Sequence, residues 1–196
     1  MATNKGKKFE DAIRQSFEKV PDVSIDRIPD QVTRYRGSSS NICDFVVYKF
    51  PILCYIECKS VKGNTLSIHS IPKKGKDGKL HGFYGNIRDN QWTGLRDKAK
   101  IDGVVAGVIC WWIDHDVTKF IPIDVLEHYR KIGRKSINFS DCYGLTVDIW
   151  GEKKRVYFDY EMDSFLKQIE DHYMFERVSA IVWKGFEDLN RYKGGD

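Results

Sequence analysis

The sequence predicts a single α/β domain in which helices flank a central mixed β-sheet. Segments with apolar residues at helical spacing alternate along the chain with short apolar runs that are typical of strands. The run 103–113 is apolar throughout, as expected for a strand that is buried on both faces. No internal repeat or long linker is visible, and 196 residues suffice for one sizeable core.

The first half of the chain is expected to contain one helix followed by several strands. Residues 6–20 carry Phe9, Ile13 and Phe17 on one helical face, and Pro21 ends this helix. After it we expect, in order, an irregular strand over 22–35 that Pro29 interrupts, strands over 42–49 and 52–60 joined by Phe50-Pro51, a strand near 65–71, and a basic loop over 71–80.

The second half continues the alternation of helices and strands. We expect a helix over 86–100, a buried strand over 103–113, an edge strand over 119–123, a helix over 124–132, a hairpin of 145–150 and 155–160 around Gly151, and a helical tail over 161–192. The division that follows is one domain over 1–196. Its core spans about 6–137, and a hairpin and helical C-terminal extension spans 138–196.

The formal net charge of +4 is unevenly distributed along the chain. Ten basic and three acidic residues between positions 59 and 100 give +7, whereas eight acidic and three basic residues between 159 and 188 give −5. A basic stretch of this kind is what a phosphate backbone needs, because each neutralised phosphate releases counterions. The alternative is a solvated lysine loop at 71–80.

The composition also indicates a compartment. Five dispersed cysteines, mostly in apolar runs, fit reduced thiols better than a disulfide framework. No secretory signal and no apolar run near the roughly 20 residues of a membrane span are visible. We therefore expect a cytoplasmic protein with no membrane partner.

The hairpin predicted around Phe50-Pro51 carries the main chemical signal. Side chains alternate along a strand, so Glu57 and Lys59 share one face, and the other face is apolar. If Phe50-Pro51 is the turn, Asp44 lies opposite Glu57, with Cβ atoms about 4.5–5.5 Å apart. Two carboxylates this close repel each other unless a proton or a cation lies between them. A hard divalent cation such as Mg²⁺, which prefers oxygen ligands, resolves the conflict.

Lys59 adds a cation beside the two carboxylates. It would orient or deprotonate a metal-bound water and then offset the charge that develops on a phosphate. This combination suits phosphodiester hydrolysis. The alternative is an exposed strand face with an ordinary cross-strand cluster of charges, and the spacing alone leaves both interpretations open.

The same residues resemble the PD-(D/E)XK nuclease motif, with Cys43 where the motif has a proline. More of the chain, over roughly 6–137, resembles the RecU Holliday-junction resolvases of Gram-positive bacteria and their phages. The similar pieces are GKKFE at 6–10, CDFVVY at 43–48, YIECKS at 55–60, NIRDNQ at 86–91, the strand GVVAGVICW that follows, and GRKSI at 133–137.

The resemblance implies a restriction-endonuclease-like core and a homodimeric endonuclease that cuts four-way DNA junctions symmetrically. It implies Mg²⁺ as cofactor, with Mn²⁺ as a substitute, and no nucleotide cofactor. By matching position, Asp44 and Glu57 would bind the metal, Lys59 would act on the water, and Glu10 would be an accessory acid and metal ligand. Gln91 would lie near the site, its alternative being polarity on a helix surface.

Basic residues that would contact DNA are Arg27, Arg34, Arg36, Lys62, Lys73, Lys74, Lys76, Lys79 and Arg88. The family has a long basic stalk before the catalytic Asp, whereas only a short segment separates Arg27 from Asp44 here. The basic loop would replace that stalk. Two other functions stay open: a restriction- or repair-type endonuclease acting on duplex or flap DNA, and a catalytically inactive DNA-binding module on the same fold.

Overall fold

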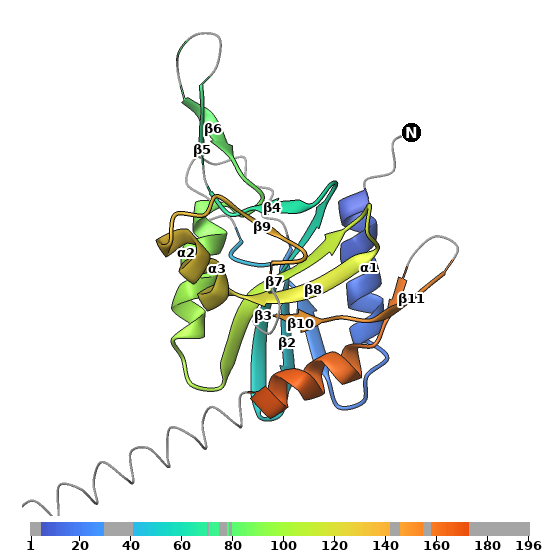
Figure 1. Cartoon of the computed structure of the whole chain (residues 1–196). Helices are drawn as coiled ribbons and strands as arrows, with labels where there is room; N and C mark the ends of the chain where they lie inside the picture. Colours follow the sequence, from blue (N-terminus) through green and yellow to red (C-terminus); the bar gives the residue numbers. More distant parts are fainter. Residues whose placement is uncertain are drawn as a thin grey trace, which may run out of the picture.

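The computed structural model describes residues 5–29, 41–69, 71–74, 78, 80–141, 146–154 and 158–172. Its centre is a six-stranded mixed sheet in the order β1-β2-β3-β7-β8-β10. Figure 1 shows α1 on one side of this sheet and the pair α2 and α3 on the other. The predicted α/β class, with helices flanking a central mixed sheet, is confirmed.

The elements follow the predicted alternation closely. In chain order they are α1 (Lys5–Phe17), β1 (Ser24–Arg27), β2 (Phe45–Lys49), β3 (Ile52–Val61), β4 (Thr65–Ser67), β5 (Ile71–Lys74), β6 (Leu80–Tyr84), α2 (Asp89–Ala99), β7 (Val104–Trp112), β8 (Val117–Pro122), α3 (Ile123–Lys131), β9 (Ser136–Asn138), β10 (Val147–Asp148), β11 (Gly151–Lys153) and β12 (Phe158–Tyr160). Residues 162–172 form a further helix.

The sheet is antiparallel from β1 to β3, and β3 then pairs with β7 in parallel over nine residue pairs. Helix α2 lies in the connection between these two parallel strands. Strand β7 is buried on both faces, as predicted, because separate apolar clusters cover its two sides. Gly107 lets β8 approach closely: a Cβ at this position would lie 2.4 Å from the carbonyl oxygen of Ile121.

Three predicted elements are corrected. Strand β8 is not an edge, because β10 pairs along its outer side. The predicted hairpin of 145–150 with 155–160 is wrong, since β12 pairs instead with the short strand β11. The basic segment 71–80 is not only a loop: it contains β5 and the first residue of β6, and these two strands pair as a hairpin that extends away from the sheet (Figure 1).

The C-terminal segment completes one half of the core. Tyr160 and Phe165 belong to the apolar cluster that includes Phe17 of α1. Two ion pairs fasten the same segment to the body: Lys49 Nζ lies 2.8 Å from Asp163, and Lys19 Nζ lies 2.6 Å from Asp159. Residues 158–172 therefore pack as part of the domain.

Within the described residues, no helix is long and apolar enough to cross a membrane.

Candidate active site

The β2–β3 hairpin has the register predicted from its turn at Phe50-Pro51. Phe45 faces Ile56 at one end of the ladder, and Lys49 faces Ile52 at the other. Asp44 lies one residue beyond the end of the ladder, so it is not a regular cross-strand partner of Glu57. Its carboxylate Oδ2 accepts a hydrogen bond of 2.7 Å from the backbone N–H of Cys58. The hairpin thus brings Asp44 beside Glu57, but the Asp44 carboxylate is held by the β3 backbone.

Glu57 is a buried carboxylate with uneven hydrogen bonding. Only 2% of the residue is exposed. Its Oε1 accepts from Lys59 Nζ and from Gln91 Nε2, both at 2.5 Å. Its Oε2 is buried and has no hydrogen-bond partner among the described residues. A bare carboxylate oxygen in this position costs free energy unless a proton or a cation satisfies it.

The electrostatics of the site reflect the crowding of acidic groups. Burial, aided by the charge of Asp44, raises the pKa of Glu57 from 4.5 to about 7, although Lys59 and Gln91 act in the opposite direction. Burial raises the pKa of the Cys58 thiol well above its usual value, and the charges of Asp44, Glu57 and Glu10 raise it further. The carboxylates of Asp44, Glu57 and Glu10 therefore all lie close enough to the Cys58 thiol to affect its pKa.

Gln91 links helix α2 to this carboxylate. Its Oε1 accepts from the backbone N–H of Arg88 at 3.0 Å and from Lys59 Nζ at 3.4 Å, while its amide nitrogen donates to Glu57. Only 6% of Gln91 is exposed. The alternative of a polar residue on the helix surface is therefore wrong, and Gln91 lies in the site. Figure 1 shows α2 packed against the sheet, and the hydrogen bond from Gln91 to Glu57 places the cluster between this helix and β3.

Glu10 comes near the site but has a different partner. Its Oε2 lies 2.7 Å from Arg27 Nη2, so two residues predicted for different tasks, metal binding and DNA binding, form an ion pair. Among the described residues, no three His, Cys, Asp or Glu side chains come together closely enough to hold a metal ion. The structure thus brings together Asp44, Glu57, Lys59 and Gln91, and the role of Glu10 as a metal ligand stays a prediction.

The predicted DNA-contacting residues lie in several places. Lys62 is exposed just beyond the end of β3, and Arg88 is exposed immediately before α2. Lys73 and Lys74 lie on β5. Arg34, Arg36, Lys76 and Lys79 lie outside the described residues. Spacing in the sequence gave no signal for the Arg27–Glu10 pair, since the partners are 17 residues apart in different elements.

The donor set fits a hard divalent cation. Asp44 and Glu57 supply carboxylate oxygens, the ligands that Mg²⁺ and Mn²⁺ prefer, and Glu57 Oε2 is the oxygen that needs a positive partner. A bound cation would also remove the repulsion between the two carboxylates that contributes to the raised pKa of Glu57. We therefore assign Asp44 and Glu57 as the residues that would hold it.

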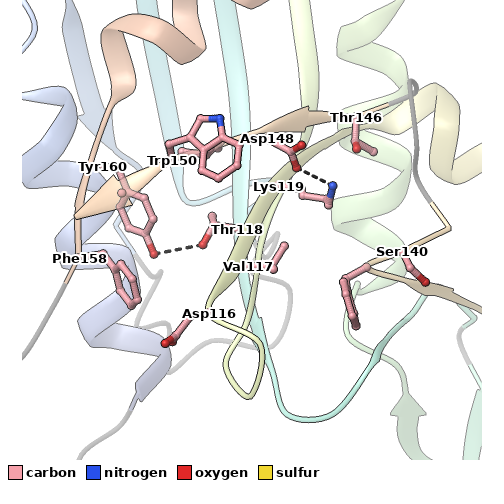
Figure 2. A pocket seen from close by; sticks show the side chains of 13 residues that line it. Asp116, Val117, Thr118, Lys119, Ser140, Thr146, Asp148, Trp150, Phe158 and Tyr160 are labelled. Atoms are coloured by element: carbon pink, nitrogen blue, oxygen red, sulfur yellow. Dashed lines mark hydrogen bonds and ion pairs between the residues drawn. The ribbon is translucent and has the colours of Figure 1, made fainter. Parts of the chain in front are cut away.

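A pocket of about 470 Å³ lies apart from this cluster and is lined by residues of β8, β10 and β12 and of the segments beside them. Figure 2 shows the hydroxyls of Thr118 and Tyr160 joined by a hydrogen bond and Lys119 paired with Asp148. Trp150 also lines the pocket and is 67% exposed. None of the predicted site residues lines it, and no pattern in the sequence had indicated it.

Comparisons with known proteins add one structural likeness. No protein-family model and no curated protein matches the chain. Among solved structures, it is similar to Hjc, a Holliday junction resolvase from the archaeal hyperthermophile Archaeoglobus fulgidus, at 18% identity and a TM-score of 0.44. The match covers 73% of this chain and 95% of that chain. At this degree of overlap, only the site residues support a function.

Proposed function

We propose that this protein is a divalent-metal-dependent DNA endonuclease that cuts four-way junctions. One observation carries the proposal: Glu57 is buried with one unpartnered carboxylate oxygen, next to Asp44 and in an ion pair with Lys59. A protein that only binds DNA gains nothing from burying a poorly satisfied carboxylate, which lowers its stability. A buried carboxyl group with a raised pKa is instead typical of catalytic sites.

The residues of the site have separable tasks in phosphodiester hydrolysis. Asp44 and Glu57 would hold Mg²⁺, which when bound polarises a phosphoryl oxygen and makes water a better nucleophile. Lys59, whose side chain is 20% exposed, holds its ammonium beside Glu57, where it would stabilise negative charge developing on the phosphate. Gln91 holds Glu57 and Lys59 in register from α2.

The preference for branched DNA rests on charge and shape. The basic stretch of the chain begins at Lys59 and includes the β5–β6 hairpin, which extends from the body (Figure 1). A basic element that extends from the body would contact phosphates of the bound DNA. Resolving a junction takes two cuts on symmetry-related strands, so we propose a homodimer with one site in each subunit.

The proposal is tested by incubating the protein with four-way junction, flap and linear duplex DNA, in Mg²⁺ or in EDTA. We expect paired symmetric nicks in the junction, dependent on Mg²⁺ and abolished in Asp44→Asn. The control is Asp163→Asn. This change removes a carboxylate of the C-terminal helix that pairs with Lys49 of β2, and the variant should cut normally.

Two outcomes would favour the other candidate functions. Equal cutting of linear duplex or flap would indicate a restriction- or repair-type endonuclease. Binding of DNA with no cutting of any substrate, in Mg²⁺ or in Mn²⁺, would indicate an inactive DNA-binding module.

The β5–β6 hairpin is expected to supply a large part of the salt dependence of DNA binding. Changing Lys73, Lys74, Lys76 and Lys79 together to Gln should reduce the slope of log affinity against log salt by as much as about 3.6, because each lost phosphate contact contributes about 0.9. Fluorescence anisotropy with labelled junction in EDTA measures this slope. Changing Lys98 and Lys100, at the other end of α2, should leave it nearly unchanged; an unaltered slope in the quadruple variant would exclude the hairpin as a DNA contact.

A further inference from the structure

The ion pair between Arg27 and Glu10 joins two groups that the proposed reaction needs apart. Arg27 Nη2 lies 2.7 Å from Glu10 Oε2, and Arg27 Nη1 lies 3.9 Å from the Asp11 carboxylate. The Arg27 side chain is 35% exposed and that of Glu10 is 22% exposed. A guanidinium in this state is accessible to a phosphate, whereas the carboxylate that it holds is the more covered partner.

Both partners lie beside the candidate metal ligands. Arg27 ends β1 and pairs with Phe45 on β2, and the next backbone N–H, of Ile28, donates to the Asp44 carbonyl at 2.9 Å. Glu10 lies on α1, and its neighbour Phe9 belongs to the same apolar cluster as Phe45, which follows Asp44, and Cys58, which follows Glu57. Glu10 is therefore near the site but engaged with an arginine.

We propose that Arg27 is a positioning residue that holds Glu10 until a DNA phosphate takes the guanidinium, which releases Glu10 toward the cation held by Asp44 and Glu57. This inference rests on the proposed nuclease function. A DNA phosphodiester carries one negative charge, as a carboxylate does. It competes for Arg27 because its two non-bridging oxygens match the fork of guanidinium N–H donors and because neighbouring phosphates of the backbone add to the attraction. Correct placement of DNA thereby completes the metal site.

The exchange has a thermodynamic consequence that can be measured without cutting DNA. If DNA weakens the Arg27–Glu10 contact and metal binding uses free Glu10, DNA and metal each raise the affinity for the other by the same factor. Removing either partner of the pair then has opposite effects on the two ligands. Loss of Arg27 favours metal and disfavours DNA, and loss of Glu10 does the reverse.

The test measures Mn²⁺ affinity in the absence of DNA, from the electron paramagnetic resonance signal of free Mn²⁺. Arg27→Gln should bind Mn²⁺ about five-fold more tightly than wild type, the factor expected for release of a partly exposed ion pair. In the Glu10→Gln background the same change should have an effect below about two-fold, because no carboxylate remains to be released. Asp11→Asn, which removes a neighbouring carboxylate of the same helix, should behave as wild type.

A second measurement follows affinity for labelled junction in EDTA. Glu10→Gln should bind a few-fold more tightly than wild type because Arg27 loses its closer carboxylate partner. Asp11→Asn should change little, because Asp11 is the more distant partner at 3.9 Å, and Arg27→Gln should bind more weakly. The inference is overturned if Arg27→Gln strengthens Mn²⁺ binding equally with and without Glu10, since that result reports only the lost positive charge. If the wild type binds neither Mn²⁺ nor DNA, the proposed function fails as well; if it binds both and the double-variant comparison shows no coupling, only the role of Arg27 fails.

Discussion

Lys59→Gln is expected to lower the rate of DNA cutting by about 100-fold or more while changing DNA affinity little. The Lys59 ammonium is the one cation in contact with Glu57 among the described residues, and it also lies within 3.4 Å of Gln91. Glutamine is of similar length and keeps a hydrogen-bond donor, but it cannot offset charge that develops on the phosphate. Single-turnover cutting at saturating protein measures the rate of the chemical step.

The Lys59 substitution has a second effect in the same direction. Lys59 lowers the pKa of Glu57, so its removal raises that pKa further and leaves the carboxyl more protonated at neutral pH. A protonated carboxyl is a poor metal ligand. We therefore expect part of the lost activity to return at higher pH and higher Mg²⁺ concentration, and the remainder to measure the direct role of the ammonium.

Lys62→Gln is the matched control because it removes the same charge three residues further along the chain, from an exposed side chain. Its effect should appear in DNA affinity and salt dependence, with a cutting rate at saturation close to that of wild type. If Lys59→Gln and Lys62→Gln lowered the rate equally, Lys59 would be a phosphate-binding residue without a special role in the chemical step.

Glu57→Gln is expected to stabilise the metal-free protein at pH 8 by about 1–3 kcal/mol while removing its response to Mg²⁺. The buried Glu57 carboxyl has its pKa raised from 4.5 to about 7. A neutral amide of the same shape avoids the cost of burying charge and can still accept from Lys59 and Gln91 through its oxygen. Its nitrogen would occupy the position of the unpartnered oxygen.

The sign of the pH dependence follows from proton binding. Between pH 4.5 and about 7 the folded protein keeps a proton on Glu57 that the unfolded chain has released, so the stability of the wild type falls as pH rises through this window. Above pH 7 the loss is complete, and below pH 4.5 it is absent. The gain in Glu57→Gln should therefore be largest at pH 8 and small at pH 4.5, as measured by urea unfolding in EDTA.

Asp163→Asn provides a contrast of opposite sign for this measurement. Hydrogen bonding and the charge of Lys49 hold the pKa of Asp163 below its usual value, so its removal should slightly reduce stability at pH 8. Adding Mg²⁺ should raise the unfolding midpoint of the wild type and of Asp163→Asn, and leave Glu57→Gln unchanged. A Glu57→Gln protein that is less stable than wild type at pH 8 would contradict the account of Glu57 as a destabilising, functional carboxylate.

Much of the candidate site could be predicted from local patterns. The two-residue alternation of a strand placed Glu57 and Lys59 on one face, and the turn at Phe50-Pro51 set the register that brings Asp44 close. These relations depend only on strand geometry. The hydrogen bond from the Cys58 N–H to the Asp44 carboxylate depends on where the ladder ends, which strand geometry alone does not specify.

The pairing of distant charges could not be predicted in this way. The sequence predicts separate tasks for Glu10 and Arg27, metal binding and DNA binding. Their ion pair arises only because α1 packs on β3 and shares an apolar cluster with Ile25 of β1 and Phe45 of β2. Likewise, β10 joins the sheet beyond β8 although the sequence favoured a local hairpin with 155–160. Short strands have weak intrinsic preferences for one pairing partner, so the strand with which they pair depends on which sheet edge lies nearby in the folded protein.

The sequence by itself determined the α/β class, the order of the elements, the strand that carries Glu57 and Lys59 on one face, and the uneven distribution of charge. These follow from periodicity and composition along short stretches of chain. Only the tertiary structure decided that α2 covers Glu57, that Gln91 is a buried member of the site, and that Arg27 engages Glu10. Burial and ion pairing depend on which surfaces meet in space. The same carboxylate that looked like half of a surface charge pair is therefore a desolvated group with one unsatisfied oxygen.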